Sequence, residues 1–74
     1  MSKVLQMPTN AVERNALLKG VNCDPNNIRE MSNDGIKAML EDKLNHVDDF
    51  SGNNGVISSC LIDLLLEIIT ERRL

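Results

Sequence analysis

A chain of 74 residues, 42% of them apolar and 26% charged, is long enough for one small domain and no more. Its net charge is −3, and its eight lysines and arginines are spread along the whole sequence, which disfavours a phosphate-binding surface. A single aromatic residue, Phe50, leaves no platform for stacked bases or proline-rich peptides.

The cysteines and the longest apolar stretch bear on location. Cys23 and Cys60 lie far apart, neither belongs to a CxxC motif and no signal peptide precedes them, so we expect reduced thiols in a cytosol. The apolar stretch 56–69 contains four polar residues and is shorter than a bilayer span. We therefore expect a soluble, cytoplasmic protein.

The N-terminal residues 1–8 predict a short extended segment, which Pro8 closes because proline disfavours a helix just before it. We expect this segment to gain order by pairing with another strand or by lying across a helix pair. The remaining residues, 9–74, form the predicted helical domain.

The first helix begins at Asn10, with Thr9 as the alternative cap. Asn10 followed by Glu13 has the spacing of a capping box, and Gly20 is a natural C-terminal stop. Its predicted apolar arc consists of Ala11, Val12, Ala16, Leu17 and Leu18.

Two further helices follow in the middle of the chain. Asp24 as cap and Pro25 as first residue predict a short helix to about Met31. Ser32 or Asn33 then caps a third helix that runs to about Val47. Its stripe at spacings of three and four is formed by Ile36, Met39, Leu40, Lys43, Leu44 and Val47.

A polar loop over 48–55, with Phe50 as a core anchor, leads to the fourth helix, 56–73. Ten of the fourteen positions from 56 to 69 are apolar, and a helix apolar around most of its circumference must be covered on most sides. Three shorter neighbours leave part of it open, so we expect a second copy to cover the rest. The predicted interface residues are Ile57, Leu61, Leu65, Ile68 and Ile69, with Leu65 and Ile69 as the central contacts.

No motif in the sequence supports catalysis, a metal or a cofactor. His46 beside Asp48 and Asp49 falls short of a zinc ligand set, and the loop that starts at Asp49 lacks the glycine and glutamate of an EF-hand. Gly52 and Gly55 precede a helix without the lysine of a P-loop. The nucleophile types at 58–60 have no GxSxG context, and the pair Asp63 and Glu67 is expected to be a solvated stripe.

These observations favour an all-α, non-enzymatic interaction module. It would self-associate and act as an adaptor or inhibitor of a macromolecular partner, in the manner of an antitoxin or a phage-encoded regulator. The surface expected to meet the partner is the polar side of the second and third helices. Its acidic end would be drawn to a basic partner site and consists of Glu41, Asp42, Asp48 and Asp49.

Two alternatives remain open. The helix pair 25–31 and 34–47 has helix-turn-helix proportions, which would suit a dimeric DNA-binding regulator, although its second helix carries acidic residues. A small-ligand sensor would need a polar pocket between subunits. Its asparagine rim would be Asn26, Asn27, Asn53 and Asn54.

Overall fold

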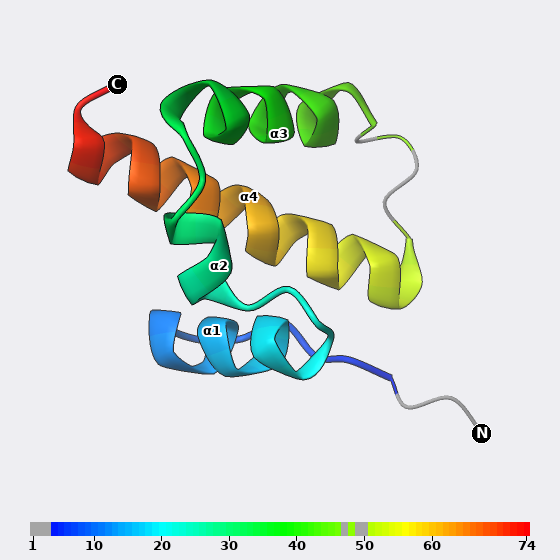
Figure 1. The fold of residues 1–74 in the computed structure, drawn as a ribbon. Coiled ribbons are helices and arrows are strands. Elements are labelled where there is room, and N and C mark those ends of the chain that lie inside the picture. The colour runs from blue at the N-terminus through cyan, green and yellow to red at the C-terminus, as the bar shows by residue number, and fades with distance from the viewer. Residues whose placement is uncertain (1–3, 47, 49–50) are drawn as a thin grey trace.

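The computed structural model describes residues 4–46, 48 and 51–74. Within them the chain forms α1 (Ala11–Gly20), α2 (Pro25–Arg29), α3 (Asn33–Asn45) and α4 (Gly52–Arg72), and no strand. This confirms the all-α prediction. In Figure 1, α4 crosses the middle of the molecule with α3 on one side and α1 and α2 on the other. Val47, Asp49 and the predicted anchor Phe50 lie outside the described residues.

The start of α1 follows the predicted capping box in part. The Asn10 side chain accepts a hydrogen bond from the Glu13 amide at 2.9 Å. The Glu13 carboxylate in turn accepts from the amide and the hydroxyl of Thr9, at 3.0 and 2.6 Å. Asn10 is thus the cap, and the return bond of the box comes from Thr9, one residue before the cap, instead of from the Asn10 amide.

The end of α1 differs from the prediction, because Gly20 is its last helical residue and does not make the turn. The left-handed position is taken by Asn22, with φ 63°. The Cys23 amide donates to the Leu18 carbonyl at 2.8 Å and the Asn22 amide donates to the Lys19 carbonyl at 3.4 Å. This is a Schellman motif in which asparagine replaces the usual glycine.

The caps of α2 and α3 settle where the middle helices begin. Asp24 accepts from the Asn26 amide at 3.0 Å, and Ser32, rather than Asn33, accepts from the Gly35 amide at 3.1 Å. A Cβ on Gly35 would stand 3.2 Å from that Ser32 hydroxyl, so the close approach favours glycine. Both helices end two residues before the predicted positions.

Helix α4 begins at Gly52, four residues before the predicted start. Glycine and asparagine are weak helix formers, so the sequence predicted a loop here. A long-range contact holds this turn, since Asn53 accepts a hydrogen bond from the Leu5 amide at 2.8 Å. Residues 4–8 are neither helix nor strand, and this bond attaches them to the start of α4.

The core is built around α4 and is closed within one chain. Its buried side chains are Leu18, Ile28, Ile36, Cys60, Leu61, Leu64, Leu65 and Ile68. Three of the predicted interface residues, Leu61, Leu65 and Ile68, are therefore only 3%, 0% and 1% exposed. Their placement on a dimer surface is wrong, because they pack in one core with Leu18 of α1, Ile28 of α2 and Ile36 of α3. Ile57 and Ile69 are half-buried and pack against this core.

Helix α4 also satisfies the length and composition test for a membrane span, with a mean hydropathy of 1.3 over its most apolar window. The central helix of a soluble protein satisfies the same test, and five residues of α4 belong to the core described above.

Candidate functional site

An ion-pair network joins α1, α2 and α4. The Arg14 guanidinium on α1 lies 2.9 Å from the Glu67 carboxylate on α4, and the Arg29 guanidinium on α2 lies 2.6 Å from the same oxygen. Arg29 also pairs with Glu71, one turn further along α4. The hydrogen bond from Arg29 to Glu71 is the main reason why the pKa of Arg29 is raised. Glu67 therefore connects three helices, which corrects its prediction as part of a solvated stripe.

Arg14 was missed as a contact residue because the apolar arc predicted for α1 excluded it. It is only 7% exposed, whereas Val12, a member of that arc, is 79% exposed. Arg14 precedes Leu18 by one helical turn, so both side chains project from the same face of α1. Burial of a guanidinium requires hydrogen-bond partners, and Arg14 has two in Asn15 and Glu67.

An arginine on α4 connects the end of this helix to the turn between α2 and α3. Arg72 donates to the carbonyls of Arg29 and Met31, at 2.5 and 2.9 Å, and to the Asn33 side chain at 3.0 Å. These carbonyls lie at the C-terminal end of α2, where a cation is favourable. The position of α2 against α4 is thus fixed by charge as well as by Ile28 in the core.

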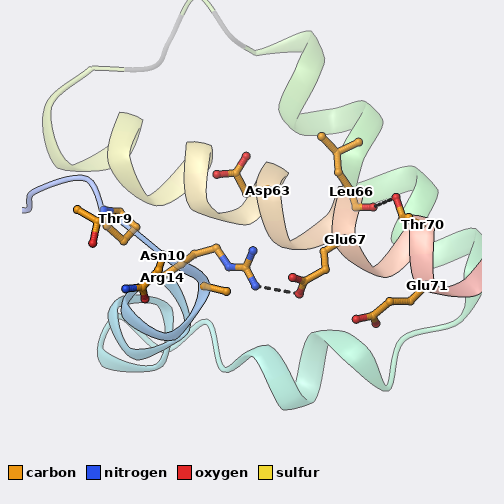
Figure 2. Close-up of a pocket in the computed structure, with 10 residues that line it drawn as sticks. Thr9, Asn10, Arg14, Asp63, Leu66, Glu67, Thr70 and Glu71 are labelled. Carbon is orange, nitrogen blue, oxygen red and sulfur yellow. Dashed lines mark hydrogen bonds and ion pairs between the residues drawn. The ribbon is translucent and has the colours of Figure 1, made fainter.

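A pocket of about 550 Å³ lies between the start of α1 and the outer side of α4, and we name it the α1–α4 pocket (Figure 2). Pro8, Ala11 and Leu66 give it apolar walls, and Leu66 is 48% exposed. Its polar lining is formed by Thr9, Asn10, Arg14, Asp63, Glu67, Thr70 and Glu71. Thr70 donates its hydroxyl to the Leu66 carbonyl at 2.9 Å.

Asp63 differs from the other carboxylates of this pocket. Glu67 and Glu71 pair with arginines, whereas the exposed carboxylate of Asp63 makes no hydrogen bond or ion pair with any part of the chain that the structure describes. Figure 2 shows Arg14 reaching Glu67 from α1, with Asp63 one turn earlier on α4 and unconnected to either. The pocket therefore combines one uncommitted carboxylate with a half-exposed leucine.

The predicted partner surface lies elsewhere, at the C-terminal end of α3. Glu41, Asp42 and Asp48 are exposed there, while Asp49 lies outside the described residues. His46 bends back over the last turn of α3, since its Nδ1 lies 2.7 Å from the Asp42 carbonyl and 3.6 Å from the Asp42 carboxylate. Of the described residues at this acidic end, none lines the α1–α4 pocket.

The asparagine rim does not form a buried polar site. Asn26, Asn27 and Asn54 are exposed, and Asn53 is engaged with the N-terminal segment. The outer face of α3 is also poorly suited to DNA, because its exposed Lys37 lies among Asp34, Glu41 and Asp42.

Neither Cys23 nor Cys60 lines the α1–α4 pocket. Cys23 and Cys60 are free thiols, and burial raises the pKa of Cys60, with a smaller contribution from the charge of Asp63. Among the described residues no three histidine, cysteine or acidic side chains gather as a metal site.

Comparison with known proteins gave no family, no curated relative and no solved structure that matches this chain.

Proposed function

We propose that this protein is a non-enzymatic interaction module that binds a protein partner at the α1–α4 pocket and thereby acts as an adaptor or inhibitor. The observation that supports the proposal most directly is the composition of this pocket. It places a 48% exposed leucine beside a carboxylate with no partner in the described chain. An anchor side chain that enters a pocket of this kind gains apolar burial together with a charge contact that fixes its orientation.

The acidic end of α3 has a supporting role in this proposal. Glu41, Asp42 and Asp48 are exposed, so their charge acts through solvent on an approaching basic surface. Charges of this kind mainly speed encounter and contribute little to the affinity of the final complex. We propose that they steer the partner and that the pocket holds it.

Self-association and a cytoplasmic location belong to the same proposal. Two free thiols fit a reducing compartment. A domain of this size has a net stability of only a few kcal/mol, and a second copy would add to it.

The test is affinity capture from the source cell with three forms of the tagged protein. Asp63→Lys reverses the uncommitted charge in the pocket, and Glu41→Lys makes the same change on the acidic end of α3. Both side chains are exposed and have no hydrogen-bond partner in the described chain, so both variants should fold as the unmodified protein does. Circular dichroism checks that both variants keep the helix content of the unmodified protein.

A partner retained by the unmodified protein and by Glu41→Lys, but lost with Asp63→Lys, would support the proposal. A partner that all three forms retain equally would refute the pocket as its site. A partner lost only with Glu41→Lys would assign binding to the acidic end of α3 instead.

A further inference from the structure

We infer that the occupant of the α1–α4 pocket is a peptide segment of a protein partner that carries a lysine or arginine, with its cation on Asp63 and its aliphatic stem on Leu66. This inference rests on the proposed function and specifies the chemistry of its site.

The charges around the pocket determine whether its occupant is a cation or an anion. Among the described residues, Arg14 and Arg29 pair with Glu67 and Glu71, and Asp63 is a third carboxylate in the lining of the same pocket. Both arginines are committed to Glu67 and Glu71, so the excess negative charge lies at Asp63. A cationic group is complementary to this wall, and an anionic group would meet repulsion from it.

The shape of the occupant follows from Leu66. The exposed leucine borders the same pocket as Asp63, so a ligand that only neutralised the carboxylate would leave this apolar surface in water. Lysine and arginine carry an aliphatic stem that covers apolar surface while the charged head pairs with a carboxylate. A single free carboxylate also provides too few ligands for a divalent cation, which needs several oxygens.

The experiment is a titration of the ¹⁵N-labelled protein, followed by amide chemical shifts. The probe is acetyl-Leu-Arg-Leu-amide, and its control contains citrulline, which keeps the shape of arginine and removes its charge. We expect saturable shifts at Asp63, Leu66 and Thr70 with the arginine peptide. Because an exposed ion pair contributes modestly to binding affinity, the citrulline peptide should bind about threefold to fivefold more weakly than the arginine peptide.

Protein variants separate the pocket from general attraction to acidic surfaces. Asp63→Asn should lower the affinity for the arginine peptide to that for the citrulline peptide. Leu66→Ala should lower the affinity for both peptides. Glu41→Gln, a change to an exposed carboxylate on α3, should leave the affinity unchanged.

Equal affinities for the two peptides, or an Asp63→Asn variant that binds as well as the unmodified protein, would overturn the inference. Saturable shifts at Asp63 with magnesium chloride alone would also overturn it, in favour of a metal. If a captured partner requires Asp63 but the arginine and citrulline peptides bind with equal affinity, the proposed function stands, and the binding of a lysine or arginine side chain at Asp63 is refuted.

Discussion

Among the described residues, two non-glycine residues adopt the left-handed backbone conformation at helix ends, Asn22 after α1 and Arg73 after α4. At both places the chain makes the same pair of backbone hydrogen bonds, which include the amide of Leu74 donating to the Ile69 carbonyl at 3.1 Å. Asparagine tolerates this conformation because its short amide bonds locally, whereas most side chains lose about 1 kcal/mol there. The direction of the chain between α1 and α2 therefore depends on the identity of Asn22.

Asn22→Ala should lower the free energy of unfolding by about 1 kcal/mol, and Asn22→Gly should change it by less than about 0.5 kcal/mol. The measurement is the urea unfolding midpoint of the two variants. Asn22 is exposed, so loss of packing does not contribute. Equal destabilisation by alanine and glycine would show that the amide side chain, and not the backbone conformation, matters at this position.

The capping box of α1 predicts a pH effect. Hydrogen bonds from the hydroxyl and amide of Thr9 hold the pKa of Glu13 below its ordinary value of 4.5. A lowered pKa in the folded state stabilises the protein above the unfolded pKa, and this contribution is lost as the pH falls through the folded pKa. The difference in Tm between the unmodified protein and Glu13→Gln should therefore be largest near neutral pH and should shrink below about pH 4.5.

Thermal unfolding between pH 3 and 7 measures this difference. Glu30→Gln is the control, because Glu30 is exposed and belongs to no capping box. A Tm difference for Glu13→Gln that stays constant across the acid range would contradict the assignment.

At the scale of the elements, the ion pairs of Glu67 hold α1 and α2 against α4. Glu67→Gln leaves the Arg14 guanidinium, whose side chain is 9% exposed, without its carboxylate. We expect a loss of about 2 kcal/mol, since a charged group that loses its partner in a largely buried site retains the cost of desolvation. Glu71→Gln should cost less than about 1 kcal/mol, because Glu71 is 53% exposed and Arg29 keeps Glu67.

The unfolding free energies of these two variants are the measurement. Replacement of both Arg14 and Glu67 by Met should recover most of the stability lost by Glu67→Gln, because well-packed apolar side chains can replace a buried pair. Similar losses for Glu67→Gln and Glu71→Gln would show that the network acts as two ordinary surface pairs.

The first three helices were largely predictable, because the N-cap of each is a contact between a side chain and a backbone amide two or three residues away. Asn10, Asp24 and Ser32 illustrate this, since each accepts a hydrogen bond from an amide that lies close to it in the sequence. The start of α4 was not predictable in this way. Its first turn is supported by the bond between Asn53 and Leu5, which joins residues 48 positions apart.

The candidate site could be predicted only in part for the same reason. The stripe of Asp63 and Glu67 is visible in the sequence, but the two carboxylates differ because of residues on other helices. Arg14 and Arg29 reach Glu67 and leave Asp63 uncommitted. The sequence contains one signal that would have identified Arg14, namely its position one turn before Leu18 on a helix with few apolar residues.

At the scale of the whole molecule, the helices of one chain bury the inner side of α4 and leave its outer side uncovered. Leu61, Leu64 and Leu65 lie inside the core, whereas Leu66 is half exposed and Ile62 is half-buried. Self-association through α4 would therefore use the outer side and not Leu61, Leu65 and Ile68. A homodimer at micromolar concentration remains the prediction, with Ile62 in place of Leu65 as its test position.

Leu65→Lys and Ile62→Lys should consequently have different effects. Lysine at position 65 would place a charge in a site with 0% exposure, at a cost of several kcal/mol, and a domain with only a few kcal/mol of net stability should then unfold. Lysine at position 62 can extend its ammonium group into solvent, so the fold should persist while a contact between two α4 surfaces is lost. Circular dichroism reports helix content, and light scattering reports mass. We expect an unfolded Leu65→Lys chain, a helical monomer for Ile62→Lys and a dimer mass for the unmodified protein. A monomer mass for the unmodified protein would refute self-association. A helical dimer for Ile62→Lys would exclude the outer side of α4 as the contact.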